Sequence, residues 1–167
     1  KMATPKLTAT RGVAVIVVTY NSEEHIERCM KCLVDQTYPP SQIILVDSGS
    51  RERGYLQSYP SIKGAQVIFA GQDVGFCKAN NCGLKKVLPE TDYVFFLNPD
   101  AFISPNYIEK AVEFMEEKQN ACWGAITGIA EGYCMKTNKP TGLYDTTGIF
   151  NTRLGRWYDR GQGQPVN

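Results

Sequence analysis

The sequence predicts an α/β fold in which a mostly parallel sheet carries helices on both faces. Short apolar segments rich in β-branched residues alternate along the chain with segments whose apolar residues repeat every three to four positions. This alternation favours right-handed crossovers between parallel strands. The chain has 167 residues, of which 43% are apolar, so it can bury a core of ordinary size.

Five strands are expected along the chain. The first segment is short and β-branched, as is typical of a strand that is covered on both faces. The five segments are Val13 to Val18, Ile43 to Val46, Gln66 to Ala70, Tyr93 to Leu97 and Trp123 to Gly128.

Three helices are expected between these strands. The first would begin at Asn21 as its N-cap, with Glu24 as the capping-box partner. The second would run from about Cys77 to Val87. The third would be capped by Ser104 and carry Pro105 at its first helical position.

These elements divide the chain into three expected parts. Residues 1–12 form a polar leader that we expect to be flexible, and residues 13–130 form the α/β domain. Residues 131–167 are rich in glycine, threonine and tyrosine and lack helical periodicity, so they are expected to form hairpins or loops.

Composition excludes several classes of protein. The formal net charge is +1, which gives no general attraction to nucleic acid. No stretch reaches the roughly 18–20 uninterrupted apolar residues of a transmembrane helix. The first residues lack the apolar region of a secretory signal, so a cytoplasmic location is expected. His25 is the only histidine, which excludes sites that need two.

Six cysteines leave two interpretations open. The close pairs Cys29 with Cys32 and Cys77 with Cys82 could hold zinc. Cys29, however, falls on the apolar side of the first expected helix. Buried free thiols, which behave as small apolar side chains, are therefore the favoured interpretation.

Polar segments follow three of the expected strands, at residues 19–21, 47–50 and 98–100. Carboxyl ends of parallel strands meet at one edge, where open α/β sheets bind ligands. Asp47 could accept a hydrogen bond from a base imide or a ribose hydroxyl, or it could be an ordinary loop carboxylate. Asp100, with Asn98 beside it, could bind Mg²⁺ or Mn²⁺, or Asn-Pro-Asp could simply form a turn. Residues 71–83 open a helix whose N–H groups could bind phosphate.

Four motifs together resemble a known family. VIVVTYN (residues 15–21), ILVDSGS (44–50), GFCKANNCG (75–83) and FLNPDA (96–101) are similar to the inverting family-2 nucleotide-sugar glycosyltransferases. These enzymes have the GT-A fold, a Rossmann-like parallel sheet, and the NPDA form most resembles their rhamnosyltransferase-like members. The likeness covers about residues 13 to 130, and residues 146–164 also resemble a later segment of those members.

The resemblance implies roles for particular residues. Thr19, Tyr20 and Asn21 would line the base pocket, Asp47 would bind the pyrimidine, and Asp100 would bind a divalent metal with the diphosphate. The full set implied to bind the nucleotide is Thr19, Tyr20, Asn21, Asp47, Ser50, Lys78, Asn81 and Asn98.

Three positions depart from the family's pattern. Asn98 replaces the first aspartate of the usual DxD motif, which leaves one carboxylate for the metal. Ser48 stands where asparagine is common, and Glu52 stands where aspartate is common.

The implied reaction is transfer of a sugar, with rhamnose as one candidate, from a UDP- or dTDP-activated donor to a glycan or lipid-linked acceptor. Peripheral membrane association of the full-length enzyme is one option. No segment after Asp100 resembles the family's general base, since only Asp145 and Asp159 are later aspartates. We therefore expect the base to lie beyond Asn167 and this chain to be a donor-binding fragment.

Two alternatives stay open, and a third is disfavoured. A non-catalytic module that binds a nucleotide sugar or a partner would share the same residues. A sugar-1-phosphate nucleotidyltransferase would need a glycine-rich, basic loop after the first strand, where this chain has Tyr20-Asn21-Ser22-Glu23-Glu24. A dinucleotide-binding dehydrogenase is disfavoured because GxGxxG is missing there.

Overall fold

The computed structural model describes residues 10–166. Residues 1–9 of the expected leader therefore lie outside the described residues. Two compact units, divided between Ala121 and Cys122, make up the chain.

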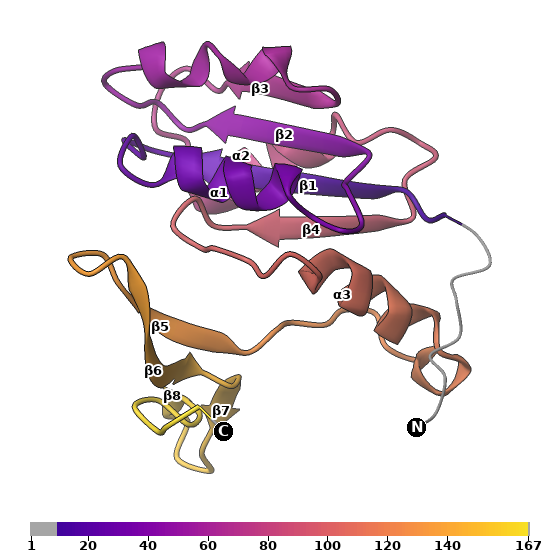
Figure 1. The fold of residues 1–167 in the computed structure, drawn as a ribbon, viewed down its shortest axis with the longest axis vertical. Helices are drawn as coiled ribbons and strands as arrows, with labels where there is room; N and C mark the ends of the chain where they lie inside the picture. The colour runs from indigo at the N-terminus through magenta and orange to yellow at the C-terminus, as the bar shows by residue number, and fades with distance from the viewer. Residues whose placement is uncertain (1–9, 167) are drawn as a thin grey trace. The chain divides into compact units, whose positions relative to one another are not determined.

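The first unit is built on a four-stranded parallel sheet in the order β3-β2-β1-β4 (Figure 1). Its strands are β1 Val13–Thr19, β2 Gln42–Asp47, β3 Ala65–Phe69 and β4 Tyr93–Leu97. All neighbouring pairs run in the same direction. The expected parallel α/β sheet is therefore confirmed, and each of its four strands lies within one or two residues of the predicted segment.

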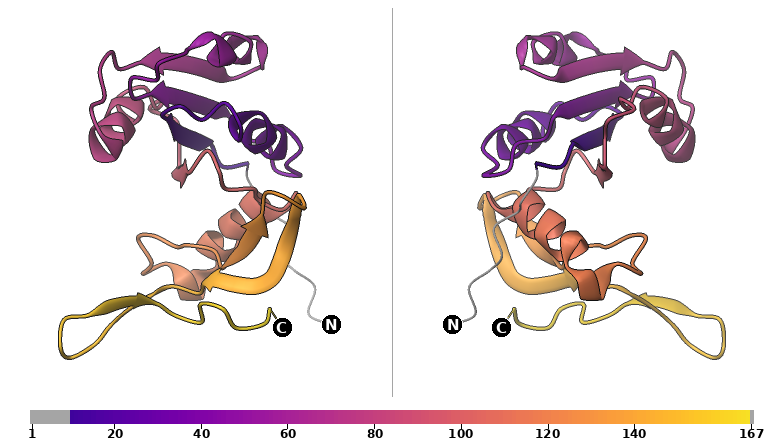
Figure 2. Two further views of the ribbon diagram at one scale, coloured as in Figure 1. Left: turned by 90° about the vertical axis from the view of Figure 1, so that its left-hand side faces the viewer. Right: turned by 90° about the vertical axis from the view of Figure 1, so that its right-hand side faces the viewer.

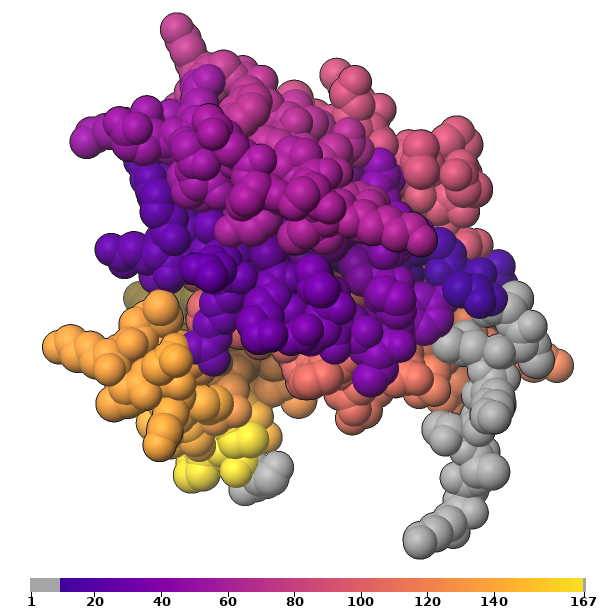
Figure 3. Space-filling model, turned by 45° about the horizontal axis from the view of Figure 1, so that its top comes forward, coloured from indigo at the N-terminus to yellow at the C-terminus, as the bar shows by residue number. Residues whose placement is uncertain are grey.

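Helices cover both faces of this sheet. α1 (Ile26–Val34) and α2 (Phe76–Leu84) lie on opposite faces, and α3 (Tyr107–Glu116) follows β4 (Figures 1 and 2). Between β2 and β3 the chain forms the short 3-10 helices η1 (Gly54–Leu56) and η2 (Tyr59–Ser61), and η2 contacts β3. In Figure 3 this part of the chain, in purple and magenta, lies at the surface. η3 (Lys118–Asn120) follows α3. Within residues 10–166, no helix has the length and apolar character needed to cross a membrane.

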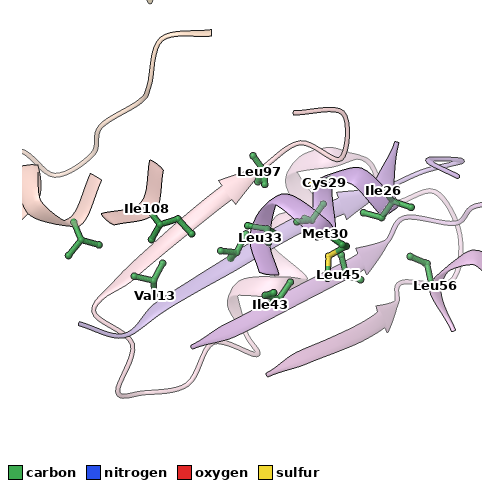
Figure 4. Close-up of a cluster of buried hydrophobic side chains, with 13 residues drawn as sticks. Val13, Ile26, Cys29, Met30, Leu33, Ile43, Leu45, Leu56, Leu97 and Ile108 are labelled. Atoms are coloured by element: carbon green, nitrogen blue, oxygen red, sulfur yellow. The ribbon is translucent and has the colours of Figure 1, made fainter. Parts of the chain in front are cut away.

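The core consists of two layers because side chains of successive strand residues point to opposite faces. Every residue of β1 is buried, as predicted for a strand covered on both faces. The smaller layer joins β1 and β2 to α2 through Ile16, Val18, Ile44, Val46 and Ala79. The larger layer packs against α1, η1 and α3 (Figure 4) and comprises Val13, Val15, Val17, Ile26, Cys29, Met30, Leu33, Ile43, Leu45, Leu56, Leu97, Ile108 and Val112.

Two predicted helix starts are wrong. α1 begins at Ile26 and no side chain caps it, because the side chain of Asn21 accepts a hydrogen bond from the N–H of Arg51 instead. α3 begins at Tyr107, and Ser104 does not cap it with its side chain. A buried glutamine serves this end of α3 instead: Gln36 accepts from the N–H of Ile108 at 3.1 Å and donates to the carbonyl of Ser104 at 2.8 Å.

The predicted fifth strand is also wrong. Trp123 to Gly128 is irregular, and the next strand is β5 (Ala130–Cys134), which pairs antiparallel with β6 (Lys139–Thr146). A second antiparallel pair joins β7 (Ile149–Asn151) and β8 (Trp157–Asp159). Short loops connect both pairs, so pairing between neighbouring segments of the chain has a small loop-closure cost. The expected hairpins of the tail are confirmed.

The buried-thiol interpretation holds for only some of the cysteines. All six thiols are free, and Cys29 is fully buried while Cys77 and Cys122 are exposed. Among residues 10–166, no group of three His, Cys, Asp or Glu side chains is placed to hold a metal ion.

A cluster of charged and polar side chains connects α3 to the amino ends of β1 and β4 through hydrogen bonds. Arg11 donates from Nε and Nη2 to Oε2 of Glu116 at 3.0 and 2.9 Å, and from Nη1 to Asp92 at 3.1 Å. The hydroxyl of Tyr93 donates to the other carboxylate oxygen of Glu116. These hydrogen bonds, first from Tyr93 and then from Arg11, hold the pKa of Glu116 below its ordinary value near 4.5.

This lowered pKa predicts a pH-dependent contribution to stability. A carboxyl group whose pKa is lower in the folded than in the unfolded state stabilises the native state when the pH is above the unfolded-state pKa. This stabilisation is lost as the pH falls through the folded-state pKa. The free energy of unfolding should therefore fall more steeply below about pH 4.5 in the wild type than in Glu116→Gln. Urea denaturation across this pH range measures it. Glu113→Gln, on the same helix outside this cluster, is the control, and equal slopes for both variants would contradict the prediction.

Candidate functional site

The carboxyl ends of the central strands line up at one edge of the sheet. Thr19 is paired in register with Asp47, and Asp47 with Phe69, so the last residues of β1, β2 and β3 are adjacent. On the other side of β1, Val17 is paired with Leu97, the last residue of β4. The strand order changes direction at β1, because β2 and β3 extend to one side and β4 lies on the other. Such a switch point is where open α/β sheets bind ligands.

Thr19 brings an unsatisfied polar atom to this edge. Its side chain is fully buried, and its Oγ1 has no hydrogen-bond partner among the described residues. Its carbonyl oxygen accepts from the N–H of Ser48 at 2.8 Å, which ties the ends of β1 and β2 together. Buried polar groups are nearly always hydrogen-bonded, so an unpaired hydroxyl here indicates a position that a ligand or water could satisfy.

Asn21 and Ser50 join the loops that follow β1 and β2. The N–H of Asn21 donates to Oγ of Ser50 at 2.9 Å, and the side-chain oxygen of Asn21 accepts from the N–H of Arg51 at 2.9 Å. Asn21 has φ of 48°, a left-handed conformation that asparagine tolerates better than most residues. Tyr20, between Thr19 and Asn21, is 49% exposed and leaves its ring accessible at the edge.

Asp47 ends β2 with a carboxylate that is fully buried. It accepts from the backbone N–H of Gly49 at 3.3 Å and of Ser50 at 3.2 Å, and it forms an ion pair with Nε of Arg53 at 3.3 Å. The carboxylate thus holds the loop that follows β2 in place. This is the role of an ordinary loop carboxylate, the alternative that the sequence left open. Buried charges are tolerated when they are paired and hydrogen-bonded in this way.

The loops after β2 and β3 touch each other directly. Ser48 donates to Oδ1 of Asp73 at 3.2 Å, and the same oxygen accepts from the N–H of Gly75 at 3.0 Å. Gly49 has φ of +102°, and a Cβ there would lie 2.5 Å from the backbone nitrogen of Asp73. Only glycine permits both this conformation and this approach.

Sequence reasoning missed two residues of this edge, Arg53 and Asp73. Arg53 lies three residues beyond the polar segment 47–50, and Asp73 lies in residues 71–83, which were considered only for their helix N–H groups. Asp73 reaches this edge through its contact with Ser48, 25 residues earlier in the chain. The ion pair of Arg53 with Asp47 has no signal in the sequence, because Arg53 lies in a loop of ordinary polar composition.

Lys78 and Asn81 lie on α2 and are both exposed. α2 follows the loop after β3 and begins beyond Gly75, whose φ is 77°. A helix that returns antiparallel to the strands has its first turn at their carboxyl edge, so Lys78 belongs near this edge. Asn81 lies one turn further along.

Asn98 and Asp100 form an exposed turn directly after β4. The carbonyl oxygen of Asn98 accepts from the N–H of Ala101 at 3.1 Å and from the thiol of Cys29 at 3.7 Å. Burial, with smaller contributions from Cys32 and Asp100, raises the pKa of the Cys29 thiol to about 12, so the thiol stays protonated beneath this turn. One exposed carboxylate with a neighbouring amide is a donor set that suits Mg²⁺ or Mn²⁺, which also takes oxygens from phosphates and waters.

A family model described as "Glycosyl transferase family 2" matches residues 14–156. This match spans most of the chain, including all four strands of the parallel sheet. The chain belongs to glycosyl transferase family 2. The resemblance of its motifs to that family is therefore confirmed.

Related proteins and structures agree with this assignment. TuaG of Bacillus subtilis, provisionally named a teichuronic acid biosynthesis glycosyltransferase, is 32% identical over 121 residues, which cover 71% of this chain and 46% of TuaG. The chain thus spans less than half of this relative.

Two solved structures share the fold. S. aureus TarS 1–349 in complex with UDP has a TM-score of 0.60 at 20% identity, covering 87% of this chain and 43% of TarS. The mannosyltransferase PcManGT from Pyrobaculum calidifontis, in complex with GDP-Man and Mn²⁺, has a TM-score of 0.58 at 23% identity, covering 66% and 34%. These matches support the expected GT-A fold.

The buried contacts of Asp47 predict that its side chain supports the loop after β2. Asp47→Ala should lower the free energy of unfolding by about 1–3 kcal/mol, because it removes the acceptor of the Ser50 N–H and the ion-pair partner of Arg53. Asp47→Asn keeps an acceptor oxygen and should lose less. Urea denaturation followed by circular dichroism measures both, and an unchanged midpoint for Asp47→Ala would show that the loop does not depend on this carboxylate.

Proposed function

We propose that the carboxyl edge of the sheet binds the nucleoside diphosphate part of a UDP- or dTDP-sugar, as the donor site of a glycosyltransferase. The observation that carries this proposal is the unpartnered, fully buried Oγ1 of Thr19 beside the buried carboxylate of Asp47. The imide N–H of a pyrimidine base can donate a hydrogen bond to the carboxylate of Asp47. A carbonyl oxygen of the same base can accept a hydrogen bond from the hydroxyl of Thr19. The UDP complex of TarS, which shares the fold, supports the same choice.

The remaining residues at this edge suit the ribose and the diphosphate. Tyr20, Asn21 and Ser50 follow β1 and β2, where the ribose would extend from the base. Lys78 and the first turn of α2 offer positive charge and free N–H groups for phosphate oxygens. Asn81, one turn on, would face the sugar.

Asp100, assisted by Asn98, would hold Mg²⁺ or Mn²⁺ against the diphosphate. When bound, the ion supplies positive charge that stabilises the diphosphate as it leaves. The Mn²⁺ in the PcManGT complex supports divalent metal use on this fold. Asn98 is neutral, so the protein contributes a single carboxylate and the phosphate oxygens must complete the site.

The reaction that we propose is a single displacement with inversion. An acceptor hydroxyl oxygen attacks the anomeric carbon while a general base removes its proton and the nucleoside diphosphate departs. Rhamnose is one candidate sugar, and a glycan or a lipid-linked molecule is the candidate acceptor. A role in polysaccharide biosynthesis is part of this proposal. The cytoplasmic location and the peripheral membrane association stay predictions.

Nucleotide binding should depend on the metal through Asp100. Calorimetry with UDP, dTDP, GDP and CDP should show the tightest binding for UDP or dTDP, strengthened by Mn²⁺. Asp100→Asn should remove most of the strengthening by Mn²⁺ and leave the metal-free affinity nearly unchanged. Asp35→Asn, which removes an exposed carboxylate after the end of α1, is the control. If Mn²⁺ strengthens nucleotide binding by Asp100→Asn as much as it strengthens binding by the wild type, the proposed metal site is refuted.

We also propose that these 167 residues alone bind the donor without transferring the sugar. General-base assistance contributes about 10²–10⁴-fold to such reactions, and no segment after Asp100 resembles the family's general base. Incubation with labelled dTDP-rhamnose or UDP-sugars and a panel of acceptors should give at most slow donor hydrolysis. Saturable glycoside formation would show that Asp145, Asp159 or another residue acts as the base. If a longer chain binds the nucleotide sugar but still transfers no sugar, the result would favour a non-catalytic module.

A further inference from the structure

Arg53 joins three parts of the site edge through one side chain. Its Nε lies 3.3 Å from Oδ2 of Asp47 and 3.4 Å from the carbonyl oxygen of Ser50, to which it donates. Its Nη2 donates to the carbonyl oxygen of Gly71 at 2.6 Å. The guanidinium also lies over the ring of Phe69, 5.6 Å from the ring centre. Arg53 therefore connects the end of β2, the following loop and the end of β3.

Arg53 differs from the other partners of Asp47 in its exposure. The carboxylate is fully buried, whereas 41% of the Arg53 side chain is exposed. The two other donors to Asp47 are backbone N–H groups of its own loop. Of the contacts described for this carboxylate, Arg53 is thus the side chain that reaches it from the solvent side.

We propose that Arg53 is a positioning residue of the nucleoside site, which fixes the Asp47 carboxylate and the end of β3 for binding of a pyrimidine nucleoside diphosphate. This inference rests on the proposed function of the same edge. A base imide needs an acceptor oxygen at a defined position, and the loop that carries Asp47 consists of small and polar residues with no apolar anchor before Tyr55. Sites of this kind depend on supporting contacts that hold the binding group in place.

The geometry calls for arginine in particular. A guanidinium is planar and carries five N–H donors, so one group can serve acceptors in different directions while one face lies on an aromatic ring. Lysine carries the same charge on a single nitrogen and cannot span the three acceptors. Charge and positioning can therefore be separated by substitution.

Calorimetric titration of the 167-residue chain with UDP at a fixed Mn²⁺ concentration tests the proposal. Arg53→Gln should weaken binding by about tenfold to a hundredfold, the range for loss of a hydrogen bond to a charged group. Arg53→Lys, which keeps the charge, should weaken binding by at least about fivefold. Arg51→Gln removes the same charge from an exposed side chain two positions away and should change the affinity by less than about twofold.

A double-mutant cycle shows whether Arg53 acts through Asp47. In an Asp47→Asn background, Arg53→Gln should change the UDP affinity by less than about threefold, because the contact it supports is already lost. Three results would each overturn the positioning role and leave the proposed function intact. In the first, Arg53→Gln changes the UDP affinity no more than Arg51→Gln does; in the second, Arg53→Lys binds UDP as tightly as the wild type. In the third, the losses of affinity from Asp47→Asn and Arg53→Gln add up in the double mutant. A wild-type chain that binds no nucleotide would overturn both. Circular dichroism of each variant confirms folding, and Arg53→Lys retains the stem and charge if Arg53→Gln does not fold.

Discussion

The complete burial of β1 between two parallel neighbours is the constraint on which the rest of the structure depends. β1 is covered by α1 on one face and α2 on the other, and it pairs with β2 and β4 along its edges. A shift of β1 as a whole would disturb the four elements that pack around it. This packing fixes where β1 ends, and the ends of β2 and β4 follow from their register with it. The candidate site is therefore placed by the core and not by the loops that carry its residues.

The same burial explains why Asp47 needs partners. A carboxylate at the end of a buried strand loses its hydration, which is costly unless hydrogen bonds and an opposite charge replace it. The loop after β2 supplies N–H groups of its own, and Arg53 supplies the charge. Asp47 thus combines a structural role in the free protein with the proposed role in binding, because its oxygens can accept more than one hydrogen bond each.

The sheet could be predicted from the sequence because its strands are continuous apolar runs bounded by polar residues. The positions of Thr19, Asp47 and Asp100 at strand ends followed directly from that pattern. The start of α1 could not be predicted, because Asn21 bonds to a loop that lies 30 residues further along the chain. Residues 123–128 have an apolar, strand-like composition, yet the next segment pairs locally with β6. Arg53 was missed because only the folded loop brings its guanidinium to Asp47 and to the carbonyl oxygen of Gly71.

A nuclear magnetic resonance titration of the ¹⁵N-labelled chain tests most directly whether the carboxyl edge of the sheet is the nucleotide site. On addition of UDP, the largest amide shifts should fall at residues 19–21 and 47–50, at the ends of β1 and β2. Mn²⁺ added with UDP should then broaden the amide signals of Asn98, Asp100 and Ala101 most strongly. Shifts concentrated in the hairpins of residues 130–159, or at the amino ends of the strands, would contradict the account.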